Sequence, residues 1–180
     1  MFSGLYGVVK FLTMKHPQDI HSQCVDDKST PLHLASREGH VKVICILVEH
    51  GIDMIAQDKH ELIPLHHASL NGHLNLACLP VEHSTNVMAQ NKVGWTLLHE
   101  ASFNGHIDLA CLLVKHSADV TALGMDGWTP LHQACHRRAR GCLGGGFGPT
   151  SCKRRCTEKG GIVGSHLGRW INCLHLGPLH

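Results

Sequence analysis

The chain has 180 residues, room for about one domain of average size, and its 43% hydrophobic content permits a packed core. The net charge of +2 is unevenly distributed, because residues 1–135 carry −5 and residues 136–180 carry +7. The sequence contains no apolar run long enough to span a membrane, and no cleavage site follows its apolar first residues. We therefore expect a cytoplasmic or nuclear protein with reduced cysteines.

A pattern with a period of 33 residues runs through most of the chain. It reads Thr-Pro-Leu-His at residues 30–33 and 129–132, Ile-Pro-Leu-His at 63–66 and Thr-Leu-Leu-His at 96–99. A Gly-His pair follows each of the first three copies. A fixed period of this length indicates stacked supersecondary units, each of which buries its apolar face against its neighbours.

The first element resembles the second half of such a unit, since residues 7–23 match residues 41–57 at an offset of 34. We assign residues 1–24 to a degenerate half repeat. Its helix is expected to have no earlier helix to cover it, so that either the sequence is truncated or this helix serves as a makeshift cap.

The next element begins the first complete unit. Thr30 is a candidate N-cap, and Pro31 occupies the first helical position, where its missing N–H costs nothing. This helix is expected to end at Gly39 in the left-handed conformation. A second, amphipathic helix is predicted over residues 41–50, and an extended turn then leads to the next unit.

These columns resemble those of the ankyrin-repeat family. The resemblance covers roughly residues 7–135, with complete repeats at 25–57, 58–90 and 91–123 and a partial repeat at 124–135. It implies an all-α ankyrin-repeat solenoid built from helix-turn-helix-hairpin units. It also implies a concave, partner-binding face formed by the hairpin tips and the inner helices.

Two hairpin tips depart from the family pattern. Lys28 and Glu61 occupy the position that holds glycine at Gly94 and Gly127. A positive φ is costly for a residue with a side chain, so we expect the first two tips to be less regular than the others.

The outer helices also depart from the pattern. Pro80 falls inside the outer helix of the second repeat, where a proline costs about 3 kcal/mol, so this repeat is the predicted weak point. Ser84 and Ser117 replace the helix-ending glycine found at Gly51.

The repeat pattern stops after residue 135. Residues 136–180 are basic and rich in glycine and show no helical or strand period, so we expect a disordered tail. A frame-shifted or unspliced reading would produce the same abrupt change. The alternative to a working protein is therefore a truncated fragment without stable function.

Eighteen histidines suggest a metal protein, but eleven of them fall into columns with one member in each unit. Neighbouring units lie about 8–10 Å apart, whereas the ligands of one zinc ion lie about 3–4 Å from each other. The columns therefore do not converge on a metal. In the ankyrin family the histidine of the first column hydrogen-bonds the backbone between units, and the resemblance implies the same role here. The columns are His33, His66, His99 and His132; His40, His73 and His106; and His16, His50, His83 and His116.

Cys45, Cys78 and Cys111 form a further column, on the outer face of the second helix. A disulfide requires Cα atoms within about 7 Å, which is less than the step between units. We expect these thiols to stay unpaired.

The tail contains the remaining candidates for chemistry. Cys152 and Cys156 have a spacing found in zinc sites, and the basic runs 137–140 and 153–155 would attract nucleic acid weakly. The intervals match no zinc-finger pattern, and the sequence shows neither a phosphate-binding loop nor a grouped catalytic triad. We predict no enzyme, no metal, no cofactor and no small-molecule substrate, and keep weak zinc or nucleic-acid binding by the tail as an alternative.

The candidate binding face follows from the family's variable positions, carried over by alignment. Leu62, Trp95 and Trp128 succeed one another in one column beside Leu70 and Phe103, an apolar patch typical of an interaction hot spot. The alternative is that each tryptophan packs on the adjoining hairpin. We predict a non-catalytic module that binds a partner protein of unknown identity. The predicted partner-binding residues are Arg37, Glu38, Lys59, Leu62, Leu70, Lys92, Trp95, Phe103, Asn104 and Trp128.

Overall fold

The computed structural model describes residues 3–74 and 87–142, and side chains within 6–74 and 87–136. These residues form helices and no strand, so the all-α prediction is confirmed for this part of the chain. None of the described helices is long and apolar enough to cross a membrane. The helices are α1 (Ser3–Lys15), the 3-10 helix η1 (Pro17–His21), α2 (Pro31–Glu38), α3 (Val41–Glu49), α4 (Pro64–Asn71), α5 (Leu97–Asn104), α6 (Ile107–Lys115) and α7 (Pro130–Cys142).

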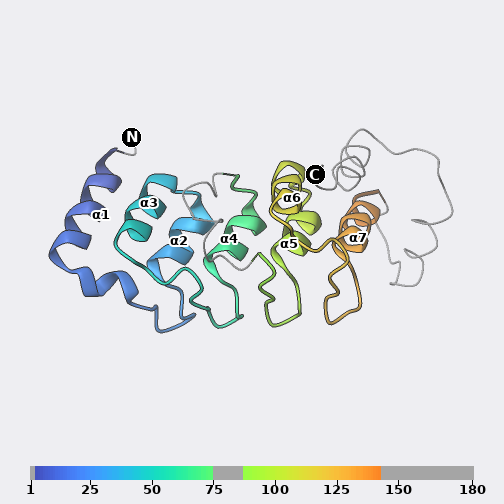
Figure 1. Cartoon of the computed structure of the whole chain (residues 1–180), viewed down its shortest axis with the longest axis horizontal. Coiled ribbons are helices and arrows are strands. Elements are labelled where there is room, and N and C mark those ends of the chain that lie inside the picture. The colour runs from blue at the N-terminus through green and yellow to red at the C-terminus, as the bar shows by residue number, and fades with distance from the viewer. Residues whose placement is uncertain (1–2, 75–86, 143–180) are drawn as a thin grey trace.

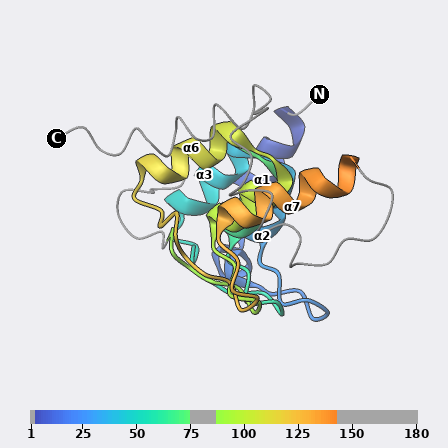
Figure 2. The ribbon, with the colours of Figure 1, turned by 90° about the vertical axis from the view of Figure 1, so that its right-hand side faces the viewer.

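The helices stand side by side along one axis, and the hairpins project from one side of the stack (Figure 1). An inner layer is formed by α2, α4, α5 and α7, each of which contacts the next. The helices α3 and α6 lie in a second layer, farther from the hairpins, as the view along the stack shows (Figure 2). This arrangement is a solenoid of helix pairs.

The inner helices begin and end at the predicted residues. The backbone N–H of Thr30 donates to Nδ1 of His33 (3.1 Å), and Thr96 and His99 repeat this contact at the same distance. The helices α2, α4 and α5 each close at a glycine in the left-handed conformation, with a φ of 69° at Gly39. The first turn and the end of these three helices are therefore set by the repeated residues themselves.

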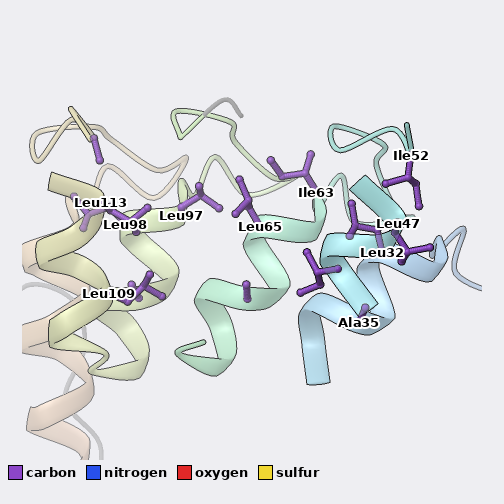
Figure 3. Close-up of a cluster of buried hydrophobic side chains, with 14 of the residues drawn as sticks. Leu32, Ala35, Leu47, Ile52, Ile63, Leu65, Leu97, Leu98, Leu109 and Leu113 are labelled. Carbon is purple, nitrogen blue, oxygen red and sulfur yellow. The ribbon is translucent and has the colours of Figure 1, made fainter. Parts of the chain in front are cut away.

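Buried aliphatic side chains join the two layers (Figure 3). Leu32, Leu65 and Leu98 occupy equivalent positions on successive inner helices and are at most 1% exposed. Leu47 and Leu113 face them from the outer helices, at 2% exposure. A fully buried leucine contributes about 1.5–3 kcal/mol, so the column of leucines is a principal source of the cohesion between repeats.

The histidine of a Gly-His pair packs on the glycine that ends the inner helix of the preceding repeat. His106 Nε2 lies 3.0 Å from the carbonyl oxygen of Leu70, and a Cβ added at Gly72 would lie 2.4 Å from the same ring. His73 meets Gly39 in the same way, at 2.6 Å. Glycine is required at these two positions both for its φ and for the approach of the neighbouring imidazole.

The prediction of irregular hairpin tips is wrong for Glu61. Its φ of 60° is close to the 74° of Gly94, and its N–H donates to the carbonyl of Asp58 as the N–H of Gly94 does to Asn91. The Glu61 side chain is exposed, so it adopts the left-handed conformation without a collision.

The first hairpin does differ from the others, for another reason. Lys28 also has a left-handed φ, 59°, but the backbone pair that closes this hairpin joins Cys24 to Ser29, whereas Asp58 pairs with Leu62 in the second repeat. The first loop is therefore one residue longer. In the third repeat, Ser117 adopts the left-handed φ of the glycine it replaces, 65°.

The ends of the described stack differ in length from the prediction. At the start, α1 packs against α3, and its Phe11 remains 59% exposed. At the other end, α7 continues to Cys142, so the prediction of a disordered tail from residue 136 onward is wrong for residues 136–142. The glycine that ends the earlier inner helices is replaced at this position by Arg138, a good helix former, and the helix does not stop there.

Several predictions fall outside the described residues. They include the weakening of the second repeat at Pro80, the column positions of Cys78 and His83, the role of Ser84, and the disorder of residues 143–180.

The prediction that the cysteine column stays unpaired is wrong for Cys111, which is disulfide-bonded. Cys45, a member of the same column, is a thiol. The distance argument holds only for partners on regularly stacked outer helices, and it placed no limit on a partner elsewhere.

Candidate protein-binding surface

The hairpin tips are connected to one another by backbone hydrogen bonds. The N–H of Lys59 donates to the carbonyl of Asp27 at 2.9 Å, and that of Met125 donates to Val93 at 3.0 Å. Between these two, the N–H of Lys92 makes the equivalent bond to the carbonyl of His60, at 3.2 Å. Residues in equivalent tip positions therefore lie in register along one edge of the stack.

The first histidine column connects each inner helix to the following hairpin. Nε2 of His33 lies 3.0 Å from the carbonyl oxygen of Leu62, and Nε2 of His99 lies 3.0 Å from that of Trp128. His66 makes the same contact with Trp95 at 3.3 Å. Because Nδ1 of each ring accepts a backbone N–H, Nε2 is the donor. The prediction that these histidines bridge units is confirmed.

Burial keeps His33, His66 and His99 neutral. It lowers the pKa of His66 to about 4, against contributions from the backbone hydrogen bonds to Trp95 and Ala89. Burial likewise lowers the pKa of His33 and of His99. Neutral rings hold the donor and acceptor pattern of the bridges at pH 7.

The backbone of the predicted binding column is also held from within its own repeat. The N–H of Leu62 donates to Oδ1 of Asp58, and the N–H of Trp95 to Oδ1 of Asn91, each at 3.0 Å. Trp128 has the same contact with Asp126 at 3.0 Å. Each column residue thus has its N–H fixed by its own hairpin and its carbonyl fixed by the preceding repeat.

Three polar pairs that the sequence analysis missed tie these hairpins to the inner helices. The sequence did contain a signal for them, because positions 67, 100 and 133 hold polar residues at the 33-residue period. The pairs are His67 Nε2–Asp58 Oδ2 at 3.0 Å, Asn91 Nδ2–Glu100 Oε1 at 3.0 Å, and Gln133 Nε2–Asp126 Oδ2 at 3.1 Å.

Two of the three carboxyl groups in these pairs, those of Asp58 and Glu100, differ in protonation. Burial tends to raise the pKa of Asp58, but hydrogen bonds from Leu62, His67 and His60 outweigh it, and the pKa is lowered. Burial raises the pKa of Glu100 to about 7, opposed only by the hydrogen bond from Asn91. Near neutral pH, Asp58 is therefore ionised while Glu100 is partly protonated.

The structure brings Trp95 and Phe103 into direct contact. Their ring centroids lie 5.3 Å apart, and Trp95 also stacks on His99 at 6.4 Å. Both aromatic residues are half-buried. Trp95 Cδ1 lies 3.0 Å from the place of a Cβ on Gly124, so this side chain also packs on the adjoining hairpin. The two alternatives considered for Trp95 are therefore compatible.

The other predicted residues are spread along the same side of the stack. Leu62 and Leu70 are half-buried, and Lys92 donates through Nζ to the carbonyl of Lys59. Trp128 contacts His136 edge to face at 4.8 Å. The remaining predicted residues, Arg37, Glu38 and Asn104, make contacts of their own that do not involve the aromatic pair. Arg37 and Glu38 pair with each other at 3.1 Å on an exposed surface, and Asn104 donates to the carbonyl of Glu100 at 3.0 Å.

The described residues contain no group of three or more metal-binding side chains. Cys152 and Cys156, the zinc candidates of the tail, lie outside the described part of the chain.

Stacked helix pairs with connected hairpins on one side define a helical repeat protein. A family model described as ankyrin repeats in three copies matches residues 1–91 and again residues 65–143. The two matches cover most of the 180 residues, and the chain belongs to the ankyrin-repeat family. Ankyrin repeats are generally protein-interaction modules and are typically non-catalytic. No curated protein sequence matches the chain at a significant level.

Proposed function

We propose that this chain is a non-catalytic protein-interaction module that binds a partner protein through its hairpins and inner helices. The observation that carries the proposal is the double anchoring of the column formed by Leu62, Trp95 and Trp128. Their backbones are held by hydrogen bonds on both sides, while their side chains stay half-exposed. A surface fixed before binding loses less conformational entropy when a partner docks.

Apolar neighbours enlarge this column into a surface. Phe103 contacts Trp95, and Leu70 occupies the equivalent place on the preceding inner helix. Val93 and Met125 extend the surface to the tips, where they are 52% and 79% exposed. Aromatic residues in such a setting contribute most of the binding energy in many interfaces.

The test compares two phenylalanine truncations. Phe103→Ala removes the centre of the proposed surface, whereas Phe11→Ala removes an equally large side chain, 59% exposed, on α1. Both variants and the wild type serve as bait in quantitative affinity purification from cell extract, after circular dichroism has confirmed folding. We expect specific partners to be retained by the wild type and by Phe11→Ala but lost with Phe103→Ala. Identical partner sets for both variants would refute the proposal.

A further inference from the structure

A chain of hydrogen bonds leads from a buried acid on α5 to the hairpin that carries Trp95. Oε1 of Glu100 accepts from Nδ2 of Asn91 at 3.0 Å. Oδ1 of Asn91 in turn accepts the backbone N–H groups of Val93 and Trp95, both at 3.0 Å. Asn91 therefore links the carboxyl group of Glu100 to the tip. Its amide NH2 donates to the carboxyl, and its amide oxygen accepts from the backbone of the tip.

Within the described part of the chain, no charged partner holds Glu100 in one state. Two described titratable side chains, His66 and His67, lie on α4, which contacts α5. Those on the other two neighbouring helices are Asp108 and Lys115 on α6, and His132, Cys135 and His136 on α7. The hydrogen bonds and ion pairs of these described residues include none to the carboxyl of Glu100 other than that from Asn91.

The equivalent link in the preceding repeat has a different chemistry. Asp58 accepts the N–H groups of His60 and Leu62 at 2.7 and 3.0 Å and pairs with Nε2 of His67. In the second repeat, therefore, the residue that accepts the hairpin N–H groups, Asp58, is itself ionised. In the third repeat the holding residue is a neutral amide, and the ionisable group lies behind it.

We propose that Glu100 is a positioning residue for the binding surface: through Asn91, its protonation sets the position of the hairpin that carries Val93 and Trp95. The protonated carboxyl is stable in its site, where Glu100 is 4% exposed. The ionised carboxylate needs hydration that this site does not offer, and water can reach it only as the hairpin moves away from α5. The link to binding rests on the proposed function, whereas the relay itself does not.

Burial raises the pKa of Glu100 to about 7, so the relay should operate near neutral pH. The stacked neighbour His99 does not produce the same signal, since burial lowers its pKa and keeps the ring neutral over this range. Protonation of His99 would fall below neutral pH, and ionisation of Glu100 occurs above it.

The test follows the fluorescence of Trp95 in the full chain with Trp128→Phe and Trp170→Phe, which leaves one tryptophan. We expect its emission to shift to longer wavelength between pH 6 and pH 8, with a midpoint near 7. Glu100→Gln, which keeps the acceptor oxygen but cannot ionise, should abolish the shift. Glu61→Gln, which removes an exposed acid from the preceding tip, should leave it unchanged.

A second measurement needs no variant. In the wild-type chain the amide proton shifts of Val93 and Trp95 should follow the same titration, since both N–H groups donate to Asn91. A flat fluorescence profile, a shift that persists in Glu100→Gln, or amide shifts that do not titrate would overturn the relay. Each of these failures would leave the proposed binding surface standing, because the partner experiment tests that surface separately.

Discussion

Replacing Gly72 by alanine tests how much of the cohesion between repeats depends on a single close approach. Gly72 and Gly105 have similar left-handed φ values, 71° and 78°. A Cβ costs about 1–2 kcal/mol at either position because of this conformation. Only at Gly72 would the Cβ also meet a neighbour, at 2.4 Å from the ring of His106, while nothing lies within 4 Å at Gly105.

The difference between the two variants is the informative quantity. To admit the Cβ, His106 must give up its hydrogen bond to the Leu70 carbonyl, which is worth about 0.5–1.5 kcal/mol, and the surroundings must repack. We therefore expect Gly72→Ala to lower the free energy of unfolding by about 1–3 kcal/mol more than Gly105→Ala does. Urea unfolding followed by far-ultraviolet circular dichroism measures both losses.

A double-mutant cycle identifies the cause. In a His106→Ala background the ring is gone, so Gly72→Ala should cost no more than Gly105→Ala, within about 0.5 kcal/mol. Equal losses in the wild-type background would refute the reasoning, because the close approach would then carry no energy. A difference that survives in the His106→Ala background would also refute it, since the cost would then arise elsewhere.

Three further predictions concern protonation and the hairpin tips. Glu100 has a pKa of about 7 when folded and 4.5 as a model value, so its stabilising effect is complete below pH 4.5 and lost as the pH rises through 7. Glu100→Gln should gain up to about 3 kcal/mol relative to the wild type between pH 5 and pH 8 in urea titrations. His66 has the opposite sign: its folded pKa of about 4 lies below 6.5, so its contribution is complete above pH 6.5 and lost as the pH falls through 4. His66→Gln should therefore show a smaller loss of stability on acidification than the wild type, by up to about 3 kcal/mol. Glu61→Gly should raise the free energy of unfolding by about 0.5–1 kcal/mol, as glycine adopts the left-handed φ without strain.

The features that repeat every 33 residues could be predicted from the sequence. The positions of α2, α4 and α5 follow from a threonine or isoleucine before each helix and a glycine after it. The bridges made by His33, His66 and His99 follow from the family resemblance, and the structure shows each with a backbone carbonyl of the following repeat. A repeated column has repeated surroundings, so one correct interpretation holds for every copy.

The features that differ between repeats were harder to predict. The pairs that involve His67, Glu100 and Gln133 join residues of different chemistry in each repeat, and their roles emerge only when the hairpin is seen against its helix. The extension of α7 depends on a missing stop signal at Arg138 rather than on a positive one. The disulfide of Cys111 was not predicted, because the argument assumed a constant step between the cysteines of the column.

The anchoring of Trp95 connects the stability of one repeat to the binding surface of the next. Its carbonyl is held by His66 of the second repeat, and its N–H by Asn91 of the third. Interactions between neighbours carry much of the stability of a repeat array, so loss of either contact loosens the tryptophan without touching its side chain. Lowering the pH affects Trp95 through protonation of His66, and raising the pH affects it through ionisation of Glu100. The surface should therefore be most rigid between these two ionisations, and a partner that needs a fixed Trp95 should bind best in the same interval.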